Sequence, residues 1–258
     1  AAQSAAALIL TAPGLSVINS AIDEARRIFG RITSYTIYRV ALTIDIMLLV
    51  VLSTVFLGFQ PLTAVMIVVM SLLDDIPIMT IAYDKTPVSP KPIRWRMPRI
   101  LSVSAVLGFF CVIQSFGLLL LGMEYLSTPE MQAQFPWIGD FDRSQLQTLM
   151  FLQLVAGGHL LLFITRCEGW FFRRPFPAAP LFLAIVATQA LAIAMCGYGW
   201  LVPAISWNLI AVVWGYNLVW MILLGIVRVE GRSTAANIRD HRTAARARCG
   251  QLVSLDLA

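Results

Sequence analysis

Six apolar stretches, each long enough to cross a lipid bilayer, constrain this chain more than any other feature. They cover approximately 36–57, 61–82, 100–122, 146–165, 179–198 and 202–227. A helix needs about 20 mostly apolar residues to cross roughly 30 Å of hydrocarbon. Only 13% of the side chains are charged, whereas about 25% are charged in an ordinary soluble domain. We therefore predict an all-α integral membrane protein, a bundle of six transmembrane helices in a lipid bilayer.

The basic residues are distributed unevenly among the segments that flank these stretches. Of the 19 Lys and Arg residues, 18 lie at the two ends of the chain or in the second-to-third and fourth-to-fifth connections. Lys and Arg near span ends are retained on the cytoplasmic side. The remaining one, Arg143, lies in 123–145 with four acidic residues. We therefore predict that both termini are cytoplasmic, and we ascribe the net charge of +5 to topology rather than to nucleic-acid binding.

Two adjacent carboxyl groups, Asp74 and Asp75, lie midway along the second stretch. An ionisable group at bilayer depth costs about 2.5 to 3.5 kcal/mol on insertion scales, which makes it a functional candidate. Burial and mutual repulsion both disfavour the charged form, so we expect one of the pair to take and release a proton. Because the two are about 100° apart around a helix, we expect one to face a central cavity and the other to be held by a partner helix. The alternative is a structural pair hydrogen-bonded between helices.

Pro77 follows the acidic pair by two residues and has no backbone N–H. We expect the helix to kink or unwind there and to free the carbonyl of Leu73. Broken helices at mid-membrane are where transporters bind ions. Calcium needs about six to eight oxygen ligands, and the first two stretches have few other polar side chains. The sequence therefore favours a proton as the cation, and it predicts no metal site.

Four further polar positions are candidates for a role at or near the membrane. Asp45, midway along the first stretch, is interpreted as a further member of the same cation site. Arg39 lies six residues earlier and either opposes Asp45 as a counter-charge or extends to the lipid headgroups. His159, in the fourth stretch, is interpreted as a hydrogen-bonded structural residue rather than a proton relay. Asp84 lies just past the second stretch and is interpreted as a helix-end or loop residue.

Several motifs also carry a family resemblance. They are 10–18 (LTAPGLSVI), 25–32 (ARRIFGRI) and 73–84 (LDDIPIMTIAYD), with further matches at 150–153 (MFLQ) and 214–217 (WGYN). Together they resemble the C-terminal part of a plasma-membrane proton-pumping P-type ATPase, over nearly the whole chain. That family has ten spans around its transport path, and the six stretches resemble the last six.

The resemblance implies a domain organisation and a role for each acid. It implies that 1–18 end the phosphorylation domain, 19–35 form a cytoplasmic stalk helix, 36–227 form the membrane domain and 228–258 form a basic cytoplasmic tail. The family's proton-carrying aspartate matches Asp75, and Arg39 and Pro77 would modulate the proton path. Two positions depart from the family pattern. Asp74 stands where many members have Asn, and Asp45 stands where members usually have an Arg that opposes proton return.

The family's catalytic motifs are absent from these 258 residues. They contain neither Asp-Lys-Thr-Gly-Thr, whose aspartate accepts phosphate, nor Gly-Asp-Gly-Val-Asn-Asp, so these residues alone have no nucleophile for an aspartyl phosphate. The resemblance implies the ion-translocating part of an ATP-driven proton exporter of the plasma membrane. Its partner would be the missing N-terminal half, and Mg and ATP would be cofactors of the parent alone. The alternatives are a non-catalytic transport or channel module, or a P-type pump for another cation.

Overall fold

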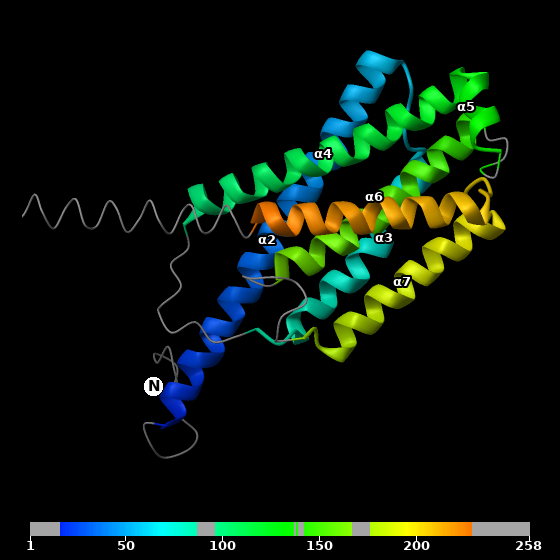
Figure 1. The fold of residues 1–258 in the computed structure, drawn as a ribbon. Coiled ribbons are helices and arrows are strands. Elements are labelled where there is room, and N and C mark those ends of the chain that lie inside the picture. The colour runs from blue at the N-terminus through cyan, green and yellow to red at the C-terminus, as the bar shows by residue number, and fades with distance from the viewer. Residues whose placement is uncertain (1–15, 87–95, 137, 139–141, 167–175, 229–258) are drawn as a thin grey trace, which may run out of the picture.

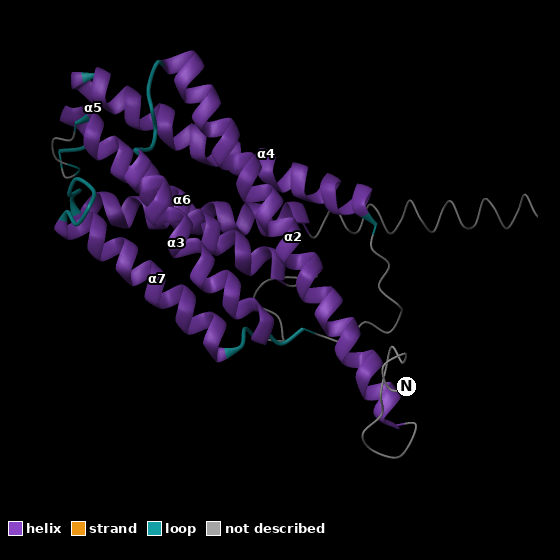
Figure 2. Cartoon of the chain, turned by 180° about the vertical axis from the view of Figure 1, so that it is seen from behind, coloured by secondary structure: helices purple, strands orange, loops and turns teal. Residues whose placement is uncertain are grey.

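The computed structural model describes residues 16–86, 96–136, 138, 142–166 and 176–228. Within these residues every regular element is a helix, and Figure 2 shows no strand among them. Six helices are long and apolar enough to cross a membrane: Ser16–Leu57, Ala64–Tyr83, Met97–Leu126, Arg143–Arg166, Ala179–Tyr198 and Trp207–Arg228. Each corresponds to one of the six predicted stretches. The predicted fold class, an all-α bundle of six spans, is therefore confirmed.

The spans follow one another along the chain in alternating directions (Figure 1). The elements are α2 (Ser16–Leu57), α3 (Ala64–Thr80), the 3₁₀ turn η1 (Ile81–Tyr83), α4 (Met97–Ser127), the short α5 (Pro129–Gln134), α6 (Arg143–Arg166), α7 (Ala179–Tyr198) and a last span, Trp207–Arg228, drawn in orange. Pro98 and Pro180 lie in the first turns of α4 and α7, where a missing N–H costs no helix hydrogen bond.

The first helix, α2, is longer than a bilayer is thick. Its 42 residues extend about 63 Å at 1.5 Å per residue, roughly twice the hydrocarbon thickness. Its N-terminal part therefore projects beyond the other spans (Figure 1). The predicted stalk, 19–35, and the predicted first span, 36–57, are thus one unbroken helix. Most of the predicted end of a phosphorylation domain, 1–18, and nearly all of the predicted tail, 228–258, lie outside the described residues.

Hydrogen bonds and two glycines fix where the spans reverse direction. Gly58, with φ +58°, ends α2, and the Ser53 hydroxyl then donates to the carbonyl of Phe59 at 2.6 Å. Gly199, with φ +76°, ends α7 and donates its N–H to the carbonyl of Met195 at 2.9 Å. Glycine adopts this left-handed backbone without steric cost. The two turns therefore follow directly from the sequence.

A capping box begins α6. The carboxylate of Asp142 accepts hydrogen bonds from the Ser144 hydroxyl at 2.7 Å and from the Gln145 N–H at 3.0 Å. In return, the side chain of Gln145 accepts from the Asp142 N–H at 3.0 Å. The hydrogen bonds that the carboxylate accepts, led by the one from the Ser144 hydroxyl, lower the pKa of Asp142 below its ordinary value. Each end of the box satisfies a backbone donor that would otherwise lack a partner.

The span α6 lies at the centre of the bundle. It packs against α2, α3, α4 and α7 and is the most completely buried of the six spans. Leu146, Phe151, Val155 and Ala156, which lie on different sides of this helix, are each fully buried. A helix that is enclosed on all sides can present a side chain to several partner helices at once. Side chains of α6 therefore link the other spans to one another.

A layer of buried polar side chains crosses the middle of the bundle between two apolar clusters. One cluster lies at the end where α2 turns into α3, and it includes Leu49, Met70 and Leu152. The other lies at the opposite end and includes Leu42 and Leu161. The layer takes at least one residue from each span: Asp45, Asp74, Gln114, Ser115, Gln153, His159, Thr188, Gln189 and Asn217. Most of the buried polar side chains of the spans therefore lie in this middle layer.

Candidate cation site

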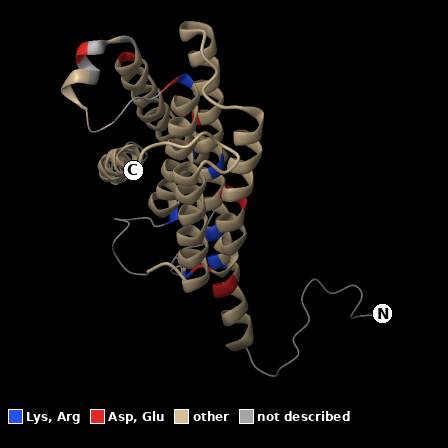
Figure 3. Cartoon of the chain, turned by 90° about the vertical axis from the view of Figure 1, so that its right-hand side faces the viewer, with Lys and Arg blue, Asp and Glu red and all other residues tan. Residues whose placement is uncertain are grey.

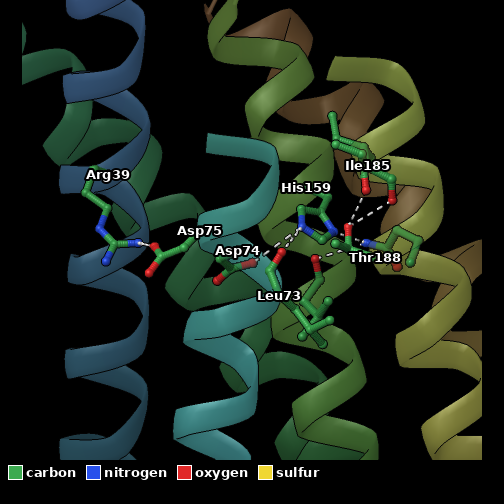
Figure 4. Close-up of polar contacts among 10 residues, drawn as sticks. Arg39, Leu73, Asp74, Asp75, His159, Ile185 and Thr188 are labelled. Atoms are coloured by element: carbon green, nitrogen blue, oxygen red, sulfur yellow. Dashed lines mark hydrogen bonds and ion pairs between the residues drawn. The ribbon is translucent and has the colours of Figure 1, made fainter. Parts of the chain in front are cut away.

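The two adjacent acids of α3 have opposite surroundings. Asp74 is buried, with 2% of its surface exposed, and it points toward α6 (Figure 4). Asp75 points toward α2, and 55% of its side chain is exposed in this chain. The two carboxyls face different directions, as expected, but within this chain Asp75 lies on an exposed side of α3 rather than in a central cavity. Their different burial means that the cost of a negative charge also differs between them.

Asp75 forms an ion pair with Arg39 of α2. The Nη1 of Arg39 lies 3.5 Å from Oδ1 of Asp75, and 42% of the arginine side chain is exposed. The structure thus places Arg39 against Asp75, rather than against Asp45 or free at the headgroups. On α3, Asp75 lies among the exposed apolar residues Val68, Leu72 and Met79, which share its side of the helix at spacings of three or four residues. This ion pair therefore lies on an uncovered apolar side of the bundle.

Asp74 lies beside His159 of α6. The Nε2 atom of His159 is 3.6 Å from Oδ1 of Asp74 and 3.3 Å from the carbonyl oxygen of Leu73. The other ring nitrogen, Nδ1, lies 2.6 Å from Nε2 of Gln189 on α7. His159 is only 1% exposed. One imidazole therefore connects α3, α6 and α7 at the level of the acidic pair, and it is hydrogen-bonded, as expected.

Of the two expected changes of the backbone at Pro77, a kink or an unwound segment, the structure lacks the second. The helix α3 continues through Pro77 to Thr80 and tightens into a 3₁₀ turn only at Ile81. It therefore does not unwind at the proline. The carbonyl of Leu73, which loses its helical donor to the proline, is bonded instead by His159. This side-chain donor satisfies the freed carbonyl, so the helix has no need to open there.

The carboxyl of Asp74 is closely surrounded, yet within the described residues its Oδ1 atom has no hydrogen-bond partner. The hydroxyl of Tyr38, from α2, is likewise buried without a partner there. Both groups border Gly158, since a Cβ built on that glycine would lie 3.6 Å from Asp74 Oδ1 and 3.7 Å from the Tyr38 hydroxyl. Gly158 thus leaves room for two polar groups to approach α6. A buried acceptor without a donor suits the neutral form of the carboxyl.

Asp45 lies at a different interface from the acidic pair. Its Oδ2 atom accepts a hydrogen bond from the Ser115 hydroxyl of α4 at 3.2 Å, and the residue is 5% exposed. Its Oδ1 atom is buried without a partner among the described residues. No hydrogen bond or ion pair joins it to Asp74 or Asp75 in the described part of the chain. The hydrogen bond of Asp45 therefore holds it to α4, and its membership of the same cation site stays a prediction.

A group of three buried amides completes the polar layer. Gln114 of α4 donates to Asn217 of the last span at 2.9 Å, and Asn217 donates to Gln153 of α6 at 2.7 Å. The sequence interpretation missed this group. Amides at the middle of an apolar span were a signal for it, because such groups need partners in hydrocarbon. Gly157 lets the helices approach, since a Cβ there would lie 3.1 Å from Asn217 Oδ1.

A second charged group lies at the end of the bundle where η1 meets α6 and α7. Asp84 is 3% exposed; its carboxylate pairs with Arg166 and accepts the N–H of Ala178 at 3.0 Å. Its backbone carbonyl accepts from Nε of Arg31, on α2, at 2.9 Å. Asp84 does lie at a helix end, as expected. The structure adds that this one residue links four segments of the chain.

Within the described residues, no group of three or more His, Cys, Asp and Glu side chains could hold a metal ion.

Comparison with proteins of known description finds relatives for nearly the whole chain. A predicted cation-transporting ATPase of Methanocaldococcus jannaschii is 38% identical over 223 residues, which are 86% of this chain and 26% of that protein. Plasma membrane ATPase 1 of Schizosaccharomyces pombe is 31% identical, over 88% of this chain and 23% of its own length. Plasma membrane ATPase 1 of Saccharomyces cerevisiae is 32% identical, over 89% and 22%. The chain thus spans about a quarter of the length of these curated relatives. No family model matches it.

Proposed function

This chain belongs to the P-type ATPases, and because its six apolar helices fit their C-terminal membrane part, we propose that it is the ion-translocating part of a pump that exports protons across the plasma membrane at the expense of ATP. The names of the yeast relatives support the plasma membrane as its location, and the name of the archaeal relative supports cation transport.

The observation that carries the choice of a proton is the arrangement of the carboxyls. Asp74, Asp75 and Asp45 each meet different side chains, so no two of them share one ligand sphere. A calcium ion needs about six to eight oxygen ligands in one place. A proton needs one carboxyl whose charged and neutral forms are both accessible. Single carboxyls in separate surroundings therefore favour a proton.

We assign the carrier role to Asp75 and a tuning role to Asp74. Asp75 faces the side of the bundle that is open in this chain, and Arg39 lies close enough to neutralise its charged form. When Asp75 takes up a proton, that attraction is lost and Arg39 is free to move away. Asp74, one residue earlier, is enclosed by α6, and whenever it ionises its charge acts on Asp75 through space. Pro77 serves this arrangement by freeing the carbonyl that His159 bonds.

Asp45 is assigned as a second buried proton site rather than a ligand of the first. It is held by a hydroxyl of α4 and by no basic side chain in the described part of the chain. A carboxyl in that setting is favoured as the neutral acid.

The remaining partners follow from the same assignment. The uncovered apolar side of α3 is where the other four spans of the family's ten would pack. The 258 residues contain no Asp-Lys-Thr-Gly-Thr to receive phosphate, so we assign the chemistry of Mg and ATP to the N-terminal half of the pump. In that arrangement the long helix α2 carries motion from the catalytic domains to the acidic pair.

The direct test is proton transport by the full-length protein that includes this chain. Mg-ATP should acidify inside-out vesicles that contain it, as reported by a pH-sensitive dye, and a protonophore should abolish the signal. Vesicles that contain only the 258 residues should neither acidify nor acquire labelled phosphate from ATP, since they lack the phosphorylated aspartate. An acid-stable phosphoenzyme on those residues, or ATP-driven uptake of another cation without acidification, would contradict the proposal.

The proposed orientation has a separate test by cysteine labelling. Ser144, at the start of α6, should lie outside the cell, and Ser20, on the projecting part of α2, should lie in the cytoplasm. In a background in which Cys167 and Cys249 are replaced by serine, we expect Ser144→Cys to react with a membrane-impermeant maleimide on intact cells. Ser20→Cys should react only after permeabilisation, because Lys and Arg hold its end of the bundle inside. The reverse pattern means that the topology is inverted.

A further inference from the structure

We propose that His159 is a positioning residue for Asp74. Its Nε2–H donates to the carbonyl of Leu73 while Asp74 is protonated, and it moves to the carboxylate of Asp74 when that group ionises. The inference rests on the proposed function in one respect, namely that the charge on Asp74 matters to transport. The histidine keeps its own proton throughout, and only the acceptor of its hydrogen bond changes.

The contacts of the second ring nitrogen determine which nitrogen of His159 carries the proton. Nε2 of Gln189 lies 2.6 Å from Nδ1 of His159, and it also donates to the carbonyl of Val155 at 3.1 Å. An amide nitrogen can only donate, so Nδ1 must be the acceptor. In the neutral imidazole the proton then lies on Nε2, the nitrogen that faces α3. Gln189 therefore fixes the tautomer in which His159 can donate toward Asp74.

Two acceptors lie within reach of that Nε2–H. The carbonyl oxygen of Leu73 is 3.3 Å away and Oδ1 of Asp74 is 3.6 Å away (Figure 4). A charge-assisted bond is shorter, about 2.7 to 2.9 Å, so the change of acceptor requires a movement on the order of 1 Å. The Leu73 carbonyl is available because Pro77 cannot donate to it. The ring can therefore leave or return without breaking a bond of the α3 ladder.

Asp74 needs such a donor only when it is charged. Its Oδ1 has no hydrogen-bond partner within the described residues, and a buried carboxylate without a donor is costly. The titratable and charged groups that face it are Tyr38 and Arg39 from α2, Asp75 from its own helix, and His159 from α6. Arg39 is already paired with Asp75. Among these groups, His159 has a donor that already lies beside Oδ1, at 3.6 Å, and the Tyr38 hydroxyl borders the same glycine, Gly158.

The exchange would connect the charge on Asp74 to a contact between spans. When Asp74 loses its proton, His159 leaves the Leu73 carbonyl, and the bond between α6 and the backbone of α3 at the proline is lost. When the proton returns, that bond forms again. A change of charge at one carboxyl thereby alters how α3 is held against α6. This is the kind of two-position element that a pump needs between its cation site and its helices.

The test is an infrared titration of Asp74 in the full-length protein, reconstituted in lipid nanodiscs. The carbonyl band of protonated Asp74 is assigned by its loss in Asp74→Asn, and the pH at its half-height is then measured in each variant. His159→Leu should raise that midpoint by about one to two pH units, because the ionised form loses a charge-assisted hydrogen bond. His159→Gln, which keeps an amide donor, should lie within about half a unit of wild type. Tyr38→Phe should leave the midpoint unchanged.

Several results would overturn the inference. An unchanged midpoint in a monodisperse His159→Leu protein would do so, as would a shift in Tyr38→Phe that His159→Leu lacks. If His159→Leu does not fold, Gln189→Leu replaces it. Without the amide the ring proton is free to move to Nδ1, so a smaller upward shift is expected, and no shift would count against the inference. The titration needs no transport, so failure of Asp75 as the carrier would leave this test unaffected.

Discussion

Replacing Asp75 by asparagine should abolish ATP-driven proton uptake into vesicles by the full-length pump. An amide of the same shape cannot alternate between a charged and a neutral form, so no proton can be carried at this position. The variant also cannot form the ion pair with Arg39, 3.5 Å away in the structure. Dye-reported acidification measures the loss, and formation of the phosphoenzyme shows that the protein is still folded and still meets ATP.

The neighbouring substitution, Asp74→Asn, should have a milder effect and serves as the comparison. An amide at this position can still accept the Nε2–H of His159, and it restores the residue that many members of the family have. The residue next to the carrier can then no longer change its charge, so we expect transport to continue with a shifted pH optimum. Asp142→Asn, in an exposed cap, is the matched control and should transport normally. Robust pumping by Asp75→Asn, or complete loss only in Asp74→Asn, would reverse the assignment.

The second large effect should be on stability and comes from the other end of the bundle. Arg166→Met leaves the carboxylate of Asp84 buried, with 4% of its side chain exposed, and without its ion-pair partner. Removing one member of a buried pair typically costs about 3 to 5 kcal/mol, mostly because of the charge left behind. We expect a lower free energy of unfolding by about that amount, measured by chemical denaturation in detergent micelles.

Two variants separate the stranded charge from general disruption. Adding Asp84→Asn to Arg166→Met removes the charge but keeps an oxygen for the N–H of Ala178, so the double variant should be more stable than Arg166→Met alone. Arg27→Met is the exposed control. Nη1 of Arg27 lies 3.4 Å from Oε2 of Glu24, and both side chains are about half exposed. Such surface pairs contribute about 0 to 1 kcal/mol. Equal destabilisation by Arg27→Met and Arg166→Met would show that burial of the pair is unimportant.

The spans and the acidic pair could be predicted from the sequence because both depend on local properties. A run of about 20 apolar residues specifies a span wherever its neighbours lie, and a charged residue within it is conspicuous. The sequence also indicates that Asp74 and Asp75 point in different directions, since adjacent residues are about 100° apart on a helix. It does not indicate which of them turns inward. That depends on how α3 is rotated against α6, which packing of the whole bundle decides.

The contacts within the polar layer could not be predicted for the same reason. Leu73 and His159 are 86 positions apart in the sequence, and Gln114 and Asn217 are 103 apart. The span pattern brings such residues to the same depth, but it leaves open which helices are neighbours. Arg39 shows the difficulty most clearly, because Asp45 is closer to it in the sequence. The rotation of α2 nevertheless directs its side chain to Asp75.

The polar layer at mid-bundle restricts how these helices can move against one another. Charges mark the two ends of the bundle and a few positions in its middle, while most of the length of the spans is uncharged (Figure 3). If one span slid along its axis by a turn, about 5.4 Å, its polar group would enter an apolar cluster and lose its partners. Piston motion is therefore costly, whereas tilting a span about a point in that layer displaces its polar group least. A force on the projecting end of α2 would then tilt the helix about the depth of Asp45, so that its two ends move in opposite directions.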